Sequence, residues 1–253
     1  MRGFAPDHAG ARVSASPNCG ARRGGRRPDA LILHYTGMAS GRAAAQRLCD
    51  PQAEVSAHYL VEEDGRIVQM VREADRAWHA GRACWHGEAD VNSLSIGVEI
   101  VNPGHDLGYP DFPARQIDAV IALGLDIARR HAIPAARVLA HSDVAPGRKV
   151  DPGEKFPWAR LAAAGLGHWV EPAPPADDTG PAAGGGGAAV AALQRDLARY
   201  GYCLAQSGRY DERTATVVAA FQRHFRPARV DGVADGGTQA TLRRLLAALP
   251  GAA

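Results

Sequence analysis

Short runs of apolar, β-branched residues recur along the first two-thirds of the chain, separated by polar and glycine-containing stretches. Runs of this length and composition predict strands. The expected strands are residues 29–35, 56–61, 66–71, 95–101 and 137–141. The Glu-Glu-Asp-Gly turn at residues 62–65 predicts that the second and third strands form a hairpin.

A helix is expected between the last two of these strands. Apolar residues recur there at helical spacing from Ile117 to Ile127. Pro113 lies near the expected start of the helix, and Pro134 lies just past its end. Since the hairpin requires antiparallel pairing and the helix connects two strands, we expect the α/β class, with a mixed central sheet flanked by helices.

The composition changes at residues 170–189, where four prolines and a run of four glycines disfavour both helix and strand. We interpret this stretch as a flexible linker. Three apolar stripes at helical spacing follow it, beginning at Val190, Val217 and Leu242. The expected organisation is a first domain at residues 1–169, a linker at 170–187 and a small three-helix domain at 188–253.

The overall composition excludes several classes of protein. The 253 residues are 46% apolar and 22% charged, as in ordinary soluble globular proteins. The net charge of +2 gives no broad positive surface, so no nucleic-acid partner is expected. We find no apolar stretch long enough for a transmembrane segment, and none in residues 1–30 that suits a signal peptide. We expect a monomer.

Two local features have ordinary interpretations. A basic cluster flanks two glycines, as in a solvated loop, and consists of Arg22, Arg23, Arg26 and Arg27. The four cysteines have neither metal-binding spacing nor the density of a disulfide framework. We interpret as free thiols Cys19, Cys49, Cys84 and Cys203.

His34 and His141 differ from the other histidines because each lies at the end of a predicted strand. Such positions place a ligand on a rigid support. Asp151 follows ten residues after His141, in a turn marked by proline and glycine. Two imidazoles and one carboxylate suit catalytic zinc, which keeps a fourth position for water. The alternative is that Asp151 only caps a turn.

Hydrolysis of an amide also needs a group that accepts the proton of water and a positive charge beside the oxyanion. Glu99 lies in the middle of a predicted strand, where a carboxylate is costly to bury unless it faces a polar site. Lys149 lies two residues before Asp151. Taken alone, Lys149 is more simply explained as an ordinary loop cation.

Five motifs follow one another along residues 29–160: LILHYTG, SAHYLVEEDGRIVQMV, AWHAG, NSLSIGVEIVN and AHSDVAPGRKVDPG. They closely resemble the type 2 N-acetylmuramoyl-L-alanine amidases, a family similar in fold to the peptidoglycan recognition proteins. Its members cleave the bond between the lactyl group of N-acetylmuramic acid and the L-alanine of the stem peptide. The resemblance implies that the zinc ligands are His34, His141 and Asp151, that the general base is Glu99 and that the oxyanion is stabilised by Lys149.

The resemblance also implies a substrate groove. The segment AWHAGRACW is similar to the one that lines this groove in the family, and aromatic faces suit sugar rings. Core packing remains the alternative for one of its tryptophans, and Arg82 stands where a small residue is frequent. Asn92 matches a polar position that supports the site or touches the stem peptide. The expected substrate-binding residues are Tyr35, His79, Trp85 and Asn92.

Residues 188–249 resemble the peptidoglycan-binding type 1 module. The pattern is visible as LQ at 193–194, GY at 201–202, GRYDERT at 208–214 and FQ at 221–222. Asp211 and Thr238 are the predicted N-caps of the last two helices. Asp235 departs from the pattern, because glycine is usual at that position.

Two alternatives to a wall amidase remain open. A non-hydrolytic recognition protein would keep the groove, although the complete set of expected site residues argues against it. An amidase of soluble anhydro-muropeptides in the cytoplasm agrees with the missing signal peptide. The wall-binding module favours the cell envelope or periplasm, where a flexible linker reaching about 25 Å would let the enzyme search neighbouring stem peptides.

Overall fold

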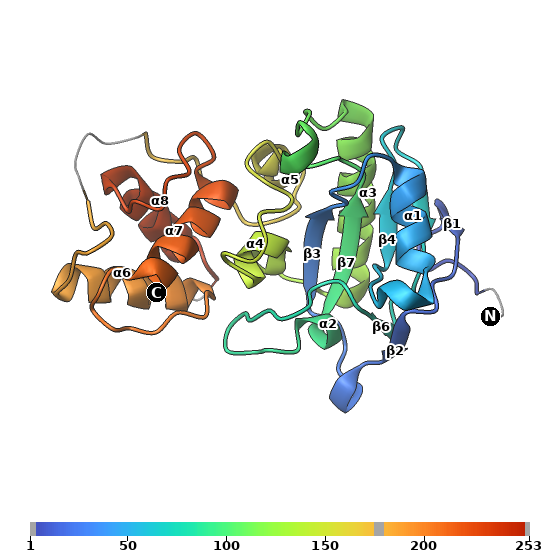
Figure 1. Cartoon of the computed structure of the whole chain (residues 1–253), viewed down its shortest axis with the longest axis horizontal. Helices are drawn as coiled ribbons and strands as arrows, with labels where there is room; N and C mark the ends of the chain where they lie inside the picture. Colours follow the sequence, from blue (N-terminus) through green and yellow to red (C-terminus); the bar gives the residue numbers. More distant parts are fainter. Residues whose placement is uncertain (1–3, 175–179, 251–253) are drawn as a thin grey trace.

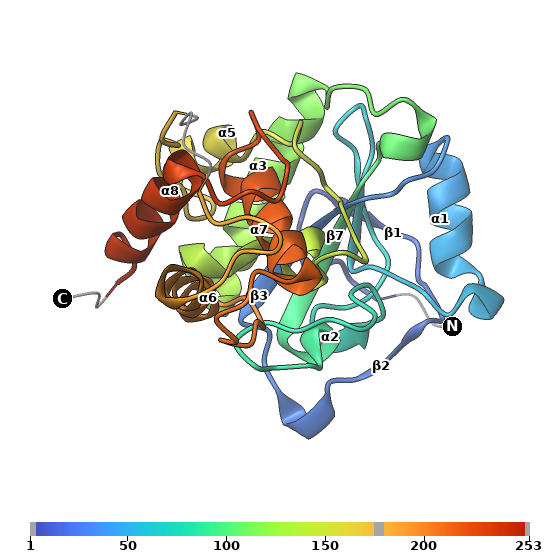
Figure 2. The ribbon, with the colours of Figure 1, turned by 60° about the vertical axis from the view of Figure 1, so that its left-hand side comes forward.

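The computed structural model describes residues 4–174 and 180–250 (Figures 1 and 2). The strands are β1 (Ala11–Val13), β2 (Cys19–Ala21), β3 (Ala30–Tyr35), β4 (Tyr59–Val61), β5 (Ile67–Gln69), β6 (Asp75–Ala77), β7 (Ser95–Ile100) and β8 (Val138–Ala140). The helices are α1 (Gly41–Cys49), α2 (Val91–Leu94), α3 (Ala114–His131), α4 (His141–Val144), α5 (Trp158–Ala163), α6 (Ala188–Tyr200), α7 (Glu212–Phe225) and α8 (Gly236–Ala247).

A six-stranded sheet forms the centre of the first part of the chain, in the order β1-β5-β4-β7-β3-β8. Strands β4 and β5 are antiparallel, as the hairpin prediction requires. The other neighbouring pairs of this sheet are parallel. The predicted mixed sheet flanked by helices is therefore confirmed, and we call this part the α/β domain.

The two faces of the sheet are covered by different elements. Tyr59 and Val61 of β4 share a core with Ile117 of α3. Leu60 points to the opposite face, where it packs with Leu48 of α1. This alternation follows from the two-residue period of a strand. The face of the sheet covered by α3 is therefore apolar core. Polar groups at the strand ends lie on the opposite face.

The helices α6, α7 and α8 form a helical domain that packs directly on the α/β domain (Figures 1 and 2). One continuous apolar cluster joins residues of both, including Ile32 and Val144 on one side and Leu193 and Phe221 on the other. A shared core of this kind holds the two domains in one arrangement. The three predicted helices are confirmed.

A disulfide between Cys84 and Cys203 also joins the two domains. The prediction of four free thiols is therefore wrong for this pair, whereas Cys19 and Cys49 are free. The partners are 119 residues apart. Spacing along the chain carries no information about such a pairing, which depends on how the domains dock.

The predicted linker is packed on the helical domain wherever it is described. The N–H of Ala173 donates to Thr241 Oγ1 at 3.0 Å, and Ala173 is buried. On the other side of the gap, the N–H of Gly187 donates to the carbonyl oxygen of Gly208 at 2.8 Å. Residues 175–179 lie outside the described residues. The expected freely moving tether is therefore wrong for the flanking residues.

Arg22 is part of the interior, which corrects its assignment to a solvated loop. Its side chain is buried, and its guanidinium donates to the carbonyl oxygens of Glu73, Asn92, Ser93 and Ser95. Five N–H donors in a planar fork allow one arginine to bind several carbonyl groups. Arg22 thereby ties the strand β7 to the segments before it.

The N-cap of α8 is Asp235, and the prediction of Thr238 at this position is wrong. An Asp235 carboxylate oxygen accepts the N–H of Thr238 at 2.8 Å, so Thr238 lies in the first turn. Asp211 caps α7 as predicted, accepting from the N–H of Thr214. The departure at Asp235 therefore supplies a standard helix start.

Candidate active site

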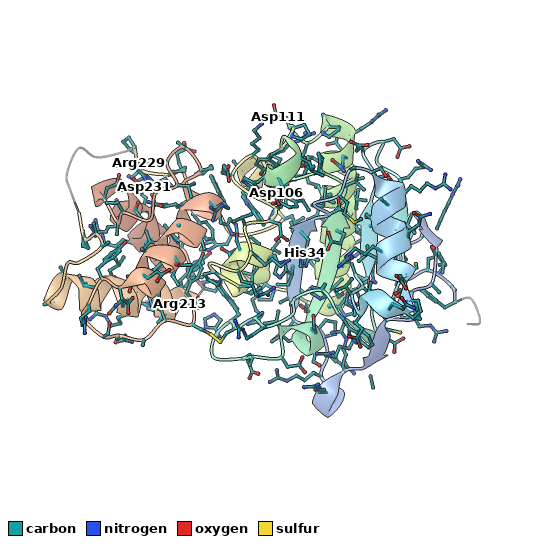
Figure 3. All side chains as sticks on the ribbon, in the orientation of Figure 1. His34, Asp106, Asp111, Arg213, Arg229 and Asp231 are labelled. Atoms are coloured by element: carbon teal, nitrogen blue, oxygen red, sulfur yellow. A yellow bond between two sulfur atoms is a disulfide. The ribbon has the colours of Figure 1, made fainter. Side chains whose placement is uncertain are left out.

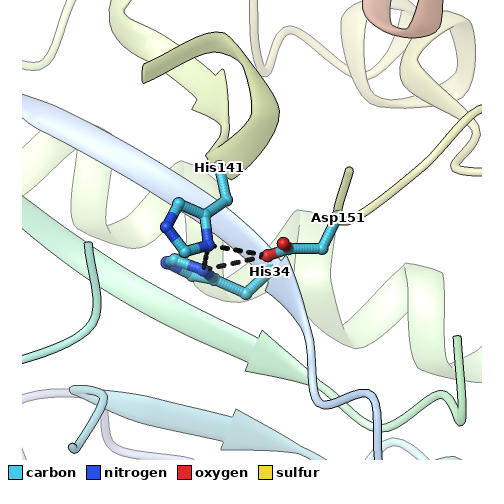
Figure 4. A group of neighbouring side chains, drawn as sticks. All are labelled: His34, His141 and Asp151. Atoms are coloured by element: carbon cyan, nitrogen blue, oxygen red, sulfur yellow. Dashed lines mark hydrogen bonds and ion pairs between the residues drawn. The ribbon is translucent and has the colours of Figure 1, made fainter. Parts of the chain in front are cut away.

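His34, His141 and Asp151 converge at one point beside the sheet (Figure 4). His34 lies near the end of β3, His141 begins α4 directly after β8, and Asp151 follows in the next loop. Nδ1 of His141 lies 2.9 Å from both His34 Nδ1 and Asp151 Oδ2. His34 Nδ1 is 3.2 Å from the same carboxylate oxygen. Three predicted ligand atoms thus face one another.

The three residues are buried, with between 1% and 5% of their surface exposed. Burial, with the nearby His141, lowers the pKa of His34 to about 4. Burial acts to raise the pKa of Asp151, but the contacts with His141 and His34 outweigh it and keep this pKa below its ordinary value. A neutral imidazole beside an ionised carboxylate is the protonation state that a divalent metal requires.

The remaining ring nitrogens are already held by the protein. Nε2 of His141 lies 3.1 Å from the carbonyl oxygen of Ala80 and 3.4 Å from Nη2 of Arg148. Nε2 of His34 lies 3.0 Å from Nδ1 of His79. The Nε2 atoms thus face other groups of the protein, and the Nδ1 atoms lie on the side of Asp151, where a metal would bind. Such outer contacts orient metal-binding histidines. The donor set therefore fits zinc.

Glu99 is placed next to this cluster by the pairing of β7 with β3, in which His34 and Glu99 are in register. Its Oε2 is inaccessible and has no hydrogen-bond partner among the described residues. Burial, together with the charge of Asp151, raises the pKa of Glu99 well above its ordinary value. An unpartnered carboxylate with a raised pKa is a candidate proton acceptor.

A cavity of about 420 Å³ opens over these groups. His141, Asp151, Glu99 and Lys149 all line it, so the structure brings the predicted catalytic residues to one wall. Of the predicted substrate-binding residues, Tyr35 and His79 also line the cavity. Figure 3 shows His34 within the α/β domain.

Trp85 does not reach the cavity, so its prediction as a substrate-binding residue is wrong. The side chain is fully buried, and its ring packs edge-on against Tyr202 at 5.0 Å between centroids. Gly201 lies so close to this ring that a Cβ there would meet it at 2.4 Å. Trp85 is therefore a core residue between the domains, the alternative left open for one tryptophan.

Asn92 supports the site from behind and does not line the cavity. Its Oδ1 accepts the backbone N–H groups of His79 and Ala80, at 3.1 and 2.8 Å. It is buried, which corrects its prediction as a substrate-binding residue and favours the supporting role. Through this residue the segment that contacts both His34 and His141 is held in place.

Two further residues that shape the site were not predicted from the sequence. Gly97 lies on the site face of β7, where a Cβ would meet the His79 ring at 2.4 Å, so only glycine leaves room for that histidine. Asp143 is completely buried two residues after His141. A glycine in a strand is a weak general signal of close approach. Asp143 carries no such signal, because its side-chain partners Tyr202 and His224 come from the other domain.

The comparisons with known proteins agree with this site. Residues 24–154 match the family described as N-acetylmuramoyl-L-alanine amidase, and residues 186–242 match a peptidoglycan binding domain. The amidase AmiD of Escherichia coli is 39% identical over 228 residues, covering 85% of this chain and 81% of its own. The 1,6-anhydro-N-acetylmuramyl-L-alanine amidase AmpD of the same organism is 36% identical over 60% of this chain and 90% of its own.

Two solved structures are similar over nearly the whole chain. AmiD of E. coli, in complex with anhydro-N-acetylmuramic acid-L-Ala-D-γ-Glu-L-Lys, has a TM-score of 0.74 and 37% identity, covering 89% of this chain and 91% of its own. AmpDh3 of Pseudomonas aeruginosa, in complex with an anhydromuramic pentapeptide, has a TM-score of 0.75 and 33% identity, covering 96% of this chain and 98% of its own.

No helix in the described ranges 4–174 and 180–250 is long and apolar enough to cross a membrane. The sequence motifs, the site and these similarities agree, and the chain belongs to the N-acetylmuramoyl-L-alanine amidases and is an enzyme of this class.

Proposed function

We propose that this amidase uses zinc, held by His34, His141 and Asp151, to cleave the bond between N-acetylmuramic acid and L-alanine. The observation that carries the proposal is the approach of the three ligand atoms, each within 3.2 Å of the other two. Zinc bound by three protein ligands lowers the pKa of water at its open position and polarises a carbonyl group. The side chains of the protein then have to transfer the protons of the attacking water and stabilise the negative charge that develops on the carbonyl oxygen.

Glu99 acts as the general base. Glu99 lines the cavity, and its Oε2 has no hydrogen-bond partner among the described residues, so this carboxylate is available to accept a proton from the attacking water. A raised pKa suits this task, because a strongly acidic carboxylate would accept a proton poorly at neutral pH. After the attack, the same carboxyl group returns the proton to the nitrogen of L-alanine.

Lys149 stabilises the oxyanion that develops on the lactyl carbonyl group. It lines the same cavity as Glu99 and Asp151. A fixed positive charge directed at the developing negative charge is among the larger contributions to amide hydrolysis. This role replaces the simpler interpretation of Lys149 as a loop cation.

Tyr35 and His79 contact the substrate in the cavity, with Asn92 holding the backbone of His79. The relatives AmiD and AmpDh3 were solved with anhydro-muropeptides, which supports a muropeptide of this class as substrate here. Purified peptidoglycan remains the second candidate, because the helical domain matches a peptidoglycan binding domain.

We also propose that the enzyme works in the cell envelope. The disulfide between Cys84 and Cys203 supports this location over the cytoplasm, because disulfides persist in oxidising compartments and are rare where thiols are kept reduced. The peptidoglycan binding domain agrees with the same location.

The test measures release of stem peptide from purified peptidoglycan and from a soluble anhydro-muropeptide. The samples are the native protein, the protein treated with a chelator and the variant Glu99→Ala. We expect cleavage that is lost with chelator, restored by added zinc and absent in Glu99→Ala. Glu63→Ala is the matched control, because Glu63 is exposed on the β4–β5 turn. Cleavage that survives complete metal removal would contradict the proposal.

A further inference from the structure

The segment from His141 to Asp151 carries three of the five proposed site residues, yet it has little regular structure. Only the single turn α4 (His141–Val144) is helical. This turn contacts α7 of the helical domain, and Val144 and Ala145 belong to the apolar cluster shared with that domain. Figure 1 shows α4 lying between α7 and β3, and α4 contacts both. The helical domain therefore forms part of the support behind the site.

Asp143 links the two domains through hydrogen bonds. Its side chain is 0% exposed. Oδ2 accepts the N–H of Ala140 at 2.8 Å, which fixes the start of the turn that carries His141. The same oxygen lies 2.6 Å from Nδ1 of His224, and Oδ1 accepts the hydroxyl of Tyr202 at 2.7 Å. His224 and Tyr202 belong to the helical domain.

A buried carboxylate is unfavourable unless hydrogen bonds or opposite charge compensate it. Among the described residues Asp143 has three hydrogen-bond partners, of which only the N–H of Ala140 comes from the α/β domain. The other two are themselves held in place. The His224 ring stacks on Trp158 with centroids 3.7 Å apart, and the Tyr202 ring packs on Trp85. The helical domain thus presents two fixed polar groups to Asp143.

Further contacts hold the same segment. Arg213 of α7, labelled in Figure 3, donates to the carbonyl oxygen of Pro146 at 3.1 Å. The carbonyl oxygen of Val144 accepts the N–H of Cys84 at 2.8 Å, and Cys84 is bonded to Cys203. The chain between His141 and Lys149 is therefore attached to the helical domain at several points besides Asp143.

We propose that Tyr202 and His224 are positioning residues for the amidase site, and that the helical domain completes the metal site through Asp143. The domain then has a second role besides binding peptidoglycan. With Asp143 held, the turn that begins at His141 keeps its imidazole directed at His34 and Asp151. This inference rests on the proposed metal site.

The test uses the full chain with Tyr202→Phe and His224→Phe, which remove the polar contacts and keep aromatic rings for packing. Tyr210→Phe is the matched control. The Tyr210 hydroxyl also makes a buried bond of 2.7 Å, but to the carbonyl oxygen of Gly232 within the helical domain. Zinc affinity is measured by competition with a chelator, at a temperature where circular dichroism shows every variant folded.

We expect Tyr202→Phe and His224→Phe to bind zinc about tenfold or more weakly, as is usual when an outer contact of a metal site is lost. Their kcat on a soluble anhydro-muropeptide should fall with KM little changed. Tyr210→Phe should match the native protein. Native zinc affinity and kcat in both test variants would overturn the inference, and so would an equal loss in Tyr210→Phe. A native protein that binds no zinc would instead overturn the proposed metal site.

Discussion

His34 and Glu99 lie opposite each other on the neighbouring parallel strands β3 and β7. Paired residues of adjacent strands point to the same face of a sheet. The proposed metal ligand and the proposed general base are therefore held side by side by backbone pairing, and their separation does not depend on a flexible loop. The less regular segment after β8 contributes His141, Lys149 and Asp151. Contacts other than strand pairing must hold these side chains in position.

Replacing Glu99 with glutamine should abolish most of the activity and leave the metal in place. The amide keeps the size of the side chain but cannot accept the proton of water, and general bases contribute about 10² to 10⁴ in rate. Stem-peptide release and zinc content should be measured on the same samples. Glu63→Gln is the control. A Glu99→Gln enzyme within a few-fold of native kcat would exclude Glu99 as the base.

Replacing Asp151 with asparagine should weaken zinc binding as well as activity. The change removes the negative charge from the ligand set while keeping its shape, and zinc prefers ionised oxygen ligands. Asp106→Asn is the control, because Asp106 lines the same cavity without touching the three ligands. Metal content after dialysis distinguishes the two variants. Native zinc content in Asp151→Asn would show that this carboxylate is no ligand.

Lys149→Met should lower kcat by about 10² to 10³ with a smaller change in KM, as when one group that stabilises an oxyanion is removed. Arg47→Met is the comparison, because Arg47 lines the cavity on α1 and has no proposed catalytic role. Steady-state kinetics on a soluble anhydro-muropeptide separate the two parameters. A change confined to KM in Lys149→Met would assign this lysine to binding alone.

Glu73 should make the fold sensitive to acid. Burial acts against its ionised form, but contacts with His131, Arg130 and Tyr59 lower its pKa from 4.5 to about 2. A lowered folded-state pKa stabilises the fold fully above the unfolded value, and this stability is lost as the pH falls towards 2. The shift corresponds to about 3 kcal/mol. Urea unfolding of the native protein between pH 6 and 2 should show this loss.

Glu73→Gln is the variant that tests this assignment. The glutamine cannot ionise, so the variant should be less stable than the native protein near neutral pH, and the difference should shrink on acidification. Its own stability should depend less on pH between 4.5 and 2. Parallel pH profiles of the two proteins would mean that other carboxyl groups cause the acid sensitivity.

Removing the disulfide between Cys84 and Cys203 should lower the free energy of unfolding by about 2 to 4 kcal/mol, since a cross-link between distant residues restricts the unfolded chain. Cys203→Ser can be compared with Cys49→Ser, which changes a free thiol. Urea midpoints measure the difference. The domains should stay docked in Cys203→Ser, because the shared apolar cluster remains. Equal midpoints in both variants would contradict a stabilising role.

The sequence predicted what depends on local patterns and on family motifs. The long helix α3 is bounded by prolines, and the strands β3 and β7 are six residues each, long enough for their patterns to be read. The strands β1, β2 and β6 were not predicted, because their sequences, Ala-Arg-Val, Cys-Gly-Ala and Asp-Arg-Ala, contain few of the β-branched and aromatic residues that mark a strand. Helix α1 was also missed, since it carries few large apolar residues and buries little beyond Ala44 and Leu48.

What the sequence could not show is set by contacts between the domains. Trp85 resembles a groove residue in its motif, but the docked Tyr202 covers it. Cys84 finds its partner only after the helical domain has packed. The proline and glycine residues of the linker show that its backbone disfavours helix and strand. They do not show that Ala173 becomes buried against the helical domain.

The packed interface has a consequence for how the enzyme would meet the cell wall. Two domains joined by a common core and a disulfide keep a constant distance and orientation between the cavity and the surface of the helical domain. A glycan strand bound by that domain would then present to the cavity only stem peptides at one offset and one rotation about the strand.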